Sequence, residues 1–289
     1  MSNDASEPVN TDPYFLEEAT YIQEEKRWRN KQRVLVFASR GIGHRYRHLM
    51  NDVKNMLPHS KSEPKFEKKQ SLQEINEIAE LKSCNNTMYF ECRKGQYLYL
   101  YASCQPMGPT IKFQVLNVHT LGELRITGNC LKASRPLLHF DSAFDEDSKP
   151  ELAVMKAALT RAFGTPRNHP KSQPFHDHIL GFYWVDEKVW VRHYQIQPAA
   201  AEFANDPERQ TLTEIGPRFV LEPILIQEGS FGGKLLFKNE QFESPAALLR
   251  AQREQKMHST VAKVKNTENA KKRKRDADMS EDEIDDIFQ

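Results

Sequence analysis

Residues 33–49 read RVLVFASRGIGHRYRHL, and this stretch decides how the fold begins. Its apolar run, 33–38, has the length and composition of a buried strand. From Gly43 to Leu57 the apolar residues recur at helical spacing, and Pro58 ends that pattern. The sequence therefore predicts a strand that passes through a short glycine-containing turn into a helix.

This strand, turn and helix superficially resemble the cofactor loop of short-chain dehydrogenases. That loop needs glycines where the backbone approaches a pyrophosphate at the start of a helix. Here Phe37 occupies the position of the first glycine, and no Tyr-x-x-x-Lys pair occurs to support hydride transfer. We therefore reject a dehydrogenase and expect no cofactor.

Basic side chains crowd the start of the predicted helix. Helical spacing places His44, Arg47 and His48 on one face, with Arg40 and Arg45 beside the helix start. Arginine neutralises phosphates and can bind them bidentately, so the cluster favours a nucleic-acid contact. His44 and His48 have a spacing that a metal could use, but the arginines around them would repel a cation. A solvated helix face is the alternative interpretation.

The same order of elements occurs twice along the chain. A helix, a hairpin and a strand introduced by Gly-Pro are expected between residues 71 and 115, and again between 151 and 224. This order predicts an α/β (α+β) fold of two similar halves, at about 33–140 and 150–243. Because the two halves share few identical residues, coincidence is the alternative.

The net charge of +1 conceals an uneven distribution. Residues 1–25 and 276–289 each carry seven acidic residues and no Lys or Arg. The stretch 26–275 therefore holds all 41 basic residues against 26 acidic ones, a net charge of +15. A basic body with acidic ends is typical of a polyanion binder, although a charge excess that only aids solubility is the alternative. We expect 1–25 to be a disordered acidic arm.

The C-terminal part of the chain is expected to be a helix, 244–268, followed by a tail, 269–289, that is first basic and then acidic. No secretory signal and no apolar run of membrane-spanning length occurs, so we expect no membrane partner. The basic run is typical of a nuclear import signal, although such runs also occur as plain tails. Its residues are Lys271, Lys272, Arg273, Lys274 and Arg275.

The residues that could support catalysis or metal binding lack the expected spacing. Four cysteines are scattered without a C-x-x-C pair, which favours reduced, buried thiols over a zinc site. His176, Asp177 and His178 lie in a proline-flanked loop, and such groups are more often a turn or a strand edge. No nucleophile elbow, H-E-x-x-H motif or P-loop accompanies them. We therefore expect no catalytic residue and no metal.

Four stretches together resemble the Brix family of ribosome biogenesis factors. They are KQRVLVFASRGIGHRYRHL (31–49), LPHSK (57–61), GPTIKF (108–113) and EIGPRF (214–219), and the match runs from about Arg33 to about Phe242. The resemblance implies a Brix domain, placed at 26–243. It also implies that each of the two α/β halves is similar to the anticodon-binding domain of class IIa tRNA synthetases.

The resemblance further implies a non-enzymatic assembly factor of the large ribosomal subunit, located in the nucleolus. The expected partners are precursor large-subunit rRNA, another assembly protein bound as an obligate or near-obligate partner, and other pre-ribosomal proteins. No small-molecule substrate is expected. The matched motifs assign RNA contact to Arg40, His44, Arg45, Arg47, Lys61, Lys112 and Arg218.

Our hypothesis is an RNA-binding assembly chaperone that holds precursor rRNA by phosphate contacts, with Tyr97 or Trp190 available to stack on unpaired bases. One alternative is a protein scaffold without RNA contact, whose basic face meets an acidic partner. Salt-dependent binding of free RNA would separate these two, because phosphate contacts release counterions. The other alternative is an enzyme acting on RNA, for which the sequence nominates no residues.

Overall fold

The computed structural model describes residues 30–64, 66–67, 71–197 and 210–285, and the predicted acidic arm lies outside these ranges. The described chain falls into two compact units, divided between Asn239 and Glu240. No helix in the described ranges is long and apolar enough to cross a membrane.

The first unit is built on one eleven-stranded sheet. Its order is β2-β1-β3-β4-β5-β10-β8-β7-β6, with β11 paired to β10 and β9 paired to β8. The strands are β1 Val34–Ala38, β2 Ser60–Ser62, β3 Asn86–Arg93, β4 Tyr97–Cys104, β5 Thr110–His119, β6 Pro136–Phe140, β7 His178–Val185, β8 Lys188–Gln197, β9 Thr211–Glu214, β10 Arg218–Gly229 and β11 Gly232–Lys238. The helices of this unit are α2 His44–Met56, α3 Glu74–Leu81, α4 Leu121–Leu124 and α5 Pro150–Phe163, with a short 3-10 helix, η1, at Ser142–Asp145.

The strands on the two sides of the sheet are connected in the same order. On one side β1 is parallel to β3, β3 forms a hairpin with β4, and β4 pairs with β5. On the other side β6 is parallel to β7, β7 forms a hairpin with β8, and β8 pairs with β10. The two sides meet where β5 and β10 pair antiparallel over eight register positions. The likeness of each half to an anticodon-binding domain stays a prediction.

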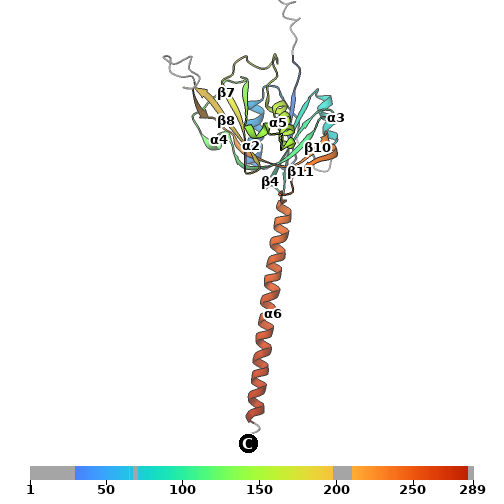
Figure 1. Ribbon diagram of the computed structural model, residues 1–289, viewed down its shortest axis with the longest axis vertical. Coiled ribbons are helices and arrows are strands. Elements are labelled where there is room, and N and C mark those ends of the chain that lie inside the picture. The colour runs from blue at the N-terminus through green and yellow to red at the C-terminus, as the bar shows by residue number, and fades with distance from the viewer. Residues whose placement is uncertain (1–29, 65, 68–70, 198–209, 286–289) are drawn as a thin grey trace, which may run out of the picture. The chain divides into compact units, whose positions relative to one another are not determined.

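A single hydrophobic cluster spans both halves. It includes Phe90 and Phe113 from the first half, and Phe182 and Phe219 from the second. Figure 1 shows the sheet curving around α2 and α5, which add ten side chains to this cluster. Helix α5 of the second half contacts β3 and β4 of the first half, so the two halves share one core.

Strand alternation places successive side chains of β4 on opposite faces of the sheet. In β4 the leucines Leu98 and Leu100 belong to the core cluster, whereas Tyr99 and Tyr101 lie outside it. The tyrosines are nevertheless buried, because Tyr101 packs against the rings of Tyr89 and Phe231 on the opposite face. Both faces of this part of the sheet are therefore largely covered.

The last helix is longer than the sequence indicated. We expected a helix at 244–268 and a tail at 269–289, but α6 runs from Pro245 to Asp285. The start agrees with the prediction, since the Ser244 hydroxyl accepts a hydrogen bond from the Ala247 N–H at 3.2 Å. The expected end was wrong because the charged stretch 269–285 contains no Gly or Pro and is rich in helix-forming residues. The basic run Lys271–Arg275 is exposed within this helix.

Phe182 tests whether the shared core stabilises the fold. Its ring is fully buried and stacks on Phe140 with 4.7 Å between ring centroids. We predict that Phe182→Ala lowers the free energy of unfolding by about 3–5 kcal/mol, because it leaves a cavity. Phe175→Ala, at a side chain that is 56% exposed, should change it by less than about 0.5 kcal/mol. Urea unfolding followed by tryptophan fluorescence measures both, and equal losses would contradict the assigned core.

His59 is buried at the junction of the two halves. Its ring centroid lies 6.0 Å from that of His169, which belongs to the second half. Burial, followed by the charge of His169, lowers the pKa of His59 to about 4. A histidine in the unfolded chain titrates near about 6.5, so the unfolded state binds the extra proton between these two values.

Stability should therefore fall as the pH is lowered from about 6.5 toward 4. Between pH 6.5 and 5, the protonation of His59 should lower the free energy of unfolding by about 2 kcal/mol. We predict that His59→Gln flattens the pH dependence of the unfolding free energy by that amount, whereas His258→Gln, an exposed position in α6, leaves the slope unchanged. An identical pH dependence in wild type and His59→Gln would show that His59 can be protonated without cost in the folded protein.

Candidate nucleic-acid interface

The start of α2 is held against the turn of the β3–β4 hairpin. Gly41 adopts a φ of +82°, a left-handed conformation that favours glycine, and Gly43 caps the helix. A Cβ atom at Gly43 would lie 3.6 Å from the carbonyl oxygen of Gly95 in that turn. The Tyr46 hydroxyl donates a hydrogen bond to the carbonyl oxygen of Gln96 at 2.5 Å. The helix start is therefore fixed by contacts with a neighbouring strand connection.

Two of the predicted RNA-contacting arginines already have partners. Arg40 pairs with Glu67, with 2.7 Å between Nη1 and Oε1. Arg45 donates a hydrogen bond to the carbonyl oxygen of Val118, and its Nε lies 3.8 Å from the Glu123 carboxylate. A phosphate would have to compete with these contacts, so the two arginines mainly position the surrounding backbone.

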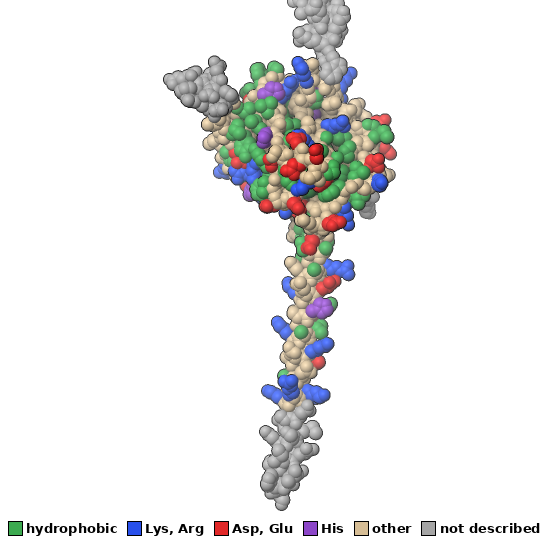
Figure 2. Space-filling view, in the orientation of Figure 1, with side chains coloured by type: hydrophobic (Ala, Val, Ile, Leu, Met, Phe, Trp, Pro, Cys, Tyr) green, Lys and Arg blue, Asp and Glu red, His purple; other side chains and the backbone are tan. Residues whose placement is uncertain are grey.

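Other cations at this site remain open to solvent. Arg47 and Lys94 are exposed, and neither forms an ion pair with another described residue. His44 and His48 lie on successive turns of α2, with 3.1 Å between their Nε2 atoms. The first turn of α2 holds no acidic residue, so its free N–H groups add to the positive potential. Figure 2 shows Lys and Arg atoms together with His atoms at the lower left of the domain, on the side where Figure 1 labels α4.

A surface pocket of about 340 Å³ adjoins these cations. Tyr46 and Tyr97 supply aromatic rings to its wall, and Arg45 supplies a cationic group. The remaining lining comes from Gln96 and from the end of β5, residues 114–119. The pocket thus combines aromatic rings with a cation, which are the groups that hold an unstacked base.

Arg218 belongs to the same region although it comes from the second half. In the β5–β10 pairing its register partner is His119, whose Nδ1 lies 3.6 Å from the Glu123 carboxylate that also faces Arg45. Its guanidinium forms two hydrogen bonds with Glu214, at 2.5 and 2.6 Å. Arg218 therefore lies across the seam from the end of β5, and it is itself held by a carboxylate.

Lys61 and Lys112, the remaining two residues predicted to contact RNA, take part in other contacts within the domain. Lys61 donates a hydrogen bond to the carbonyl oxygen of Lys82 at 2.7 Å. The Lys112 ammonium lies over the rings of Tyr99 and Tyr101, at 5.1 and 5.0 Å, and burial lowers its pKa. Both side chains stabilise the domain through these contacts, and RNA contact by either stays a prediction.

Of the two aromatic residues expected to stack on bases, only Tyr97 lies at the pocket. Trp190 is half-buried in β8, and the Arg192 guanidinium lies 5.1 Å from its ring centroid. Lys94 and His119 were missed by the sequence analysis. The hairpin turn was a signal for Lys94, whereas His119 is brought to the site by the pairing of β4 with β5 and by the contact of Arg45 with Val118.

Comparison with known proteins identifies the family. Residues 39–225, which include the start of α2 and the β5–β10 seam, match the model of the Brix domain. The chain belongs to the Brix domain family. Over 247 residues it is 49% identical to a Xenopus laevis relative named Ribosome biogenesis protein BRX1 homolog, covering 86% of this chain and 68% of the relative. Over 223 residues it is 51% identical to Ribosome biogenesis protein BRX1 of Saccharomyces cerevisiae, covering 76% of each chain.

Solved structures of two archaeal proteins are more distant from this Brix-family chain. A probable ribosomal biogenesis protein from Aeropyrum pernix is 17% identical with a TM-score of 0.43, covering 66% of this chain and 96% of that one. An archaeal Imp4-like protein is 11% identical with a TM-score of 0.33, covering 68% and 99%. Because both scores are below 0.5, the fold assignment rests on the family match and on the strand order.

Proposed function

We propose that this Brix-family chain is a non-enzymatic assembly factor of the large ribosomal subunit, which binds precursor rRNA at the start of α2 and acts in the nucleolus. The relatives named above are ribosome biogenesis proteins, and about half of the aligned residues are identical to theirs. That identity supports a role in ribosome biogenesis for this chain as well. The proposal goes beyond the names of these relatives in three points, which are the large subunit, the RNA contact and the nucleolar location.

The observation that carries the RNA contact is the group of solvent-exposed cations around a helix start. Arg47, Lys94 and the pair of His44 and His48 offer donors that no described carboxylate occupies. Phosphate oxygens bind well to such donors and to the free N–H groups of a helix N-terminus. The net charge of +15 over residues 26–275 would attract the RNA before these contacts form.

The pocket beside these cations supports single-stranded or looped RNA over a regular duplex. Bases in a duplex are stacked and cannot enter a pocket, whereas an unpaired base can lie against an aromatic ring. With a phosphate at Arg47 or Lys94, a neighbouring base would reach Tyr97. The phosphate contacts would supply affinity, and the pocket would select unpaired segments.

A protein partner is supported by exposed apolar side chains in the linker, in β6 and in the loop before β7. Leu131 and Phe175 are 58% and 56% exposed, and Leu137 is 43% exposed. The Arg135 N–H donates to the Phe175 carbonyl oxygen at 2.8 Å, which brings the loops that carry these residues together. Grouped apolar side chains on a surface are typical of protein-binding sites, so we assign the partner assembly protein to this face. The exposed basic run of α6 is proposed as the nuclear import signal.

The first test changes the exposed cations. We predict that Arg47→Glu combined with Lys94→Glu weakens binding of a single-stranded RNA by about tenfold or more at moderate salt. Because two phosphate contacts would be lost, the slope of log affinity against log salt should also decrease by about 1.4. Fluorescence anisotropy over a series of salt concentrations measures both quantities.

The matched control carries the same change of charge on β11, as Lys234→Glu with Lys238→Glu, both exposed. It should bind RNA nearly as well as the wild type. If both double variants lose affinity equally, only net charge matters and no site exists at α2. If the wild type fails to bind RNA at any salt concentration, the chain is a protein scaffold.

The second test changes the pocket. We predict that Tyr97→Ala weakens binding of unpaired RNA by about 1–3 kcal/mol, the usual value of one stacked base. The salt slope should stay at its wild-type value, because no phosphate contact is removed. Trp190→Ala is the comparison variant and should have little effect, since its ring is already covered by Arg192. If Trp190→Ala lowers RNA affinity more than Tyr97→Ala does, the stacking site lies at β8 and not at the pocket.

A further inference from the structure

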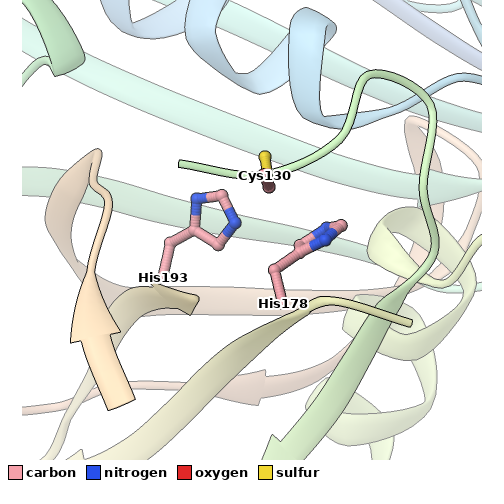
Figure 3. A group of neighbouring side chains, drawn as sticks. All are labelled: Cys130, His178 and His193. Atoms are coloured by element: carbon pink, nitrogen blue, oxygen red, sulfur yellow. The ribbon is translucent and has the colours of Figure 1, made fainter. Parts of the chain in front are cut away.

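Three metal-ligating side chains from separate segments meet at the loop that joins the two halves. Cys130 lies in that loop, His178 opens β7 and His193 lies in β8, and their ligand atoms are all within 4.8 Å of one another. The two histidines are 2% and 1% exposed, and Cys130 is half-buried. Figure 3 shows the two rings and the cysteine side chain grouped between the loop and the strands.

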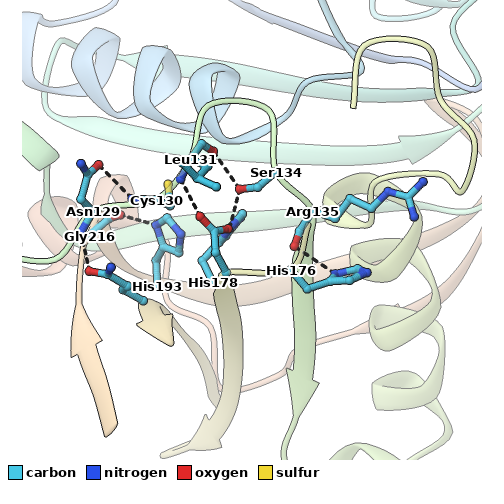
Figure 4. Close-up of polar contacts among 11 residues, drawn as sticks. Asn129, Cys130, Leu131, Ser134, Arg135, His176, His178, His193 and Gly216 are labelled. Carbon is cyan, nitrogen blue, oxygen red and sulfur yellow. Dashed lines mark hydrogen bonds and ion pairs between the residues drawn. The ribbon is translucent and has the colours of Figure 1, made fainter. Parts of the chain in front are cut away.

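The hydrogen bonds of both histidines leave a lone pair on Nε2. His193 Nδ1 lies 2.6 Å from the carbonyl oxygen of Gly216, which can only accept, so Nδ1 carries the proton. His178 Nδ1 lies 2.6 Å from the Asp177 carboxylate and donates to it in the same way. Figure 4 shows His178 and His193 with the loop residues around them. Metal-binding histidines typically donate their second ring N–H to a carbonyl or carboxylate.

His193 Nε2 is buried and has no hydrogen-bond partner in the structure. Buried polar atoms in folded proteins nearly always have one, so this nitrogen needs an explanation. Among the described residues, Cys130 forms no hydrogen bond with this nitrogen, although its sulfur lies within 4.8 Å of a ring nitrogen of His193.

We propose that Cys130, His178 and His193 bind a zinc ion, with water as the fourth ligand. One thiolate and two imidazoles form a donor set that zinc commonly takes. Around tetrahedral zinc such atoms are about 3.3–3.6 Å apart, so the group has to contract by about 1 Å. On binding, the Cys130 S–H bond breaks, the sulfur bonds to zinc and the proton passes to water, without oxidation of any group.

We expected no metal from the sequence because these ligands are not paired along the chain. Cys130 is 48 residues from His178, and His178 is 15 residues from His193. Only the parallel pairing of β6 with β7 and the β7–β8 hairpin bring them together. Asp177 serves as the carboxylate that orients His178, and it also accepts a hydrogen bond from the Leu131 N–H in the same loop.

The ion would connect the linker between the halves to the sheet of the second half. Through His193 and its bond to Gly216 it would also stabilise the segment that leads into Arg218 at the seam. The ion would therefore hold the linker against the second half, while its three protein ligands leave the fourth coordination position to water. The zinc site stands independently of the proposed RNA contact, because no residue is shared between them.

The experiment measures zinc in the tag-free, full-length chain by mass spectrometry and then replaces it with cobalt. We expect one zinc per chain, and a cobalt complex with visible bands of tetrahedral geometry and a near-ultraviolet thiolate-to-cobalt band. Cys130→Ser should abolish the thiolate band, and His193→Gln should lower cobalt affinity by about tenfold or more. Circular dichroism verifies that each variant folds.

Two control variants distinguish this site from other potential ligands. Cys84→Ser removes another buried cysteine, and His44→Gln with His48→Gln removes the exposed histidine pair on α2. Both should retain zinc and the cobalt spectrum. The proposal is overturned if the wild type binds neither metal, if Cys130→Ser retains the thiolate band, or if either control loses it. Should Cys130→Ser fail to fold, the proposal is supported by a thiolate band that is present in the wild type and persists in Cys84→Ser. It is contradicted if that band is absent from either protein.

Discussion

The antiparallel pairing of β5 with β10 is the constraint on which the rest of the structure depends. Eight register positions join the two halves into one sheet, and this allows α5 of the second half to pack on β3 and β4 of the first. The hydrophobic cluster is consequently continuous, and neither half contains a complete core of its own. The same pairing sets Arg218 opposite His119, so two residues that are 99 positions apart in the chain meet at the seam.

At that place the basic residues divide into two groups with different roles. Arg40, Arg45 and Arg218 are each paired with a carboxylate, and Arg45 also donates a hydrogen bond to the carbonyl oxygen of Val118. Arg47 and Lys94 extend into solvent from a helix and a turn that are held together by the Tyr46 hydrogen bond. Pre-organised, unpaired cations lose little on binding a phosphate, whereas paired ones must first give up a partner. The RNA-binding proposal therefore rests on the smaller, exposed group.

Much of this architecture follows from local sequence pattern, and the remainder does not. Apolar spacing predicts β1 and α2, and alternation predicts both hairpins, because each depends on residues that are close in the chain. The extent of α6 was missed, since a dense charge run was interpreted as a tail although its residues favour a helix. The partners of Arg40 and Arg45, and the meeting of Cys130 with His178 and His193, depend on tertiary contacts. No spacing rule within one segment could have revealed them.

The central claim is that precursor rRNA contacts this chain at the start of α2. Ultraviolet crosslinking in cells, followed by sequencing of the bound RNA, tests it most directly when the wild type is compared with the variant that combines Arg47→Glu and Lys94→Glu. The account predicts reads concentrated on one region of precursor large-subunit rRNA in the wild type, and their loss in the variant. Concentrated reads that persist in the variant, or diffuse reads in the wild type, would contradict it.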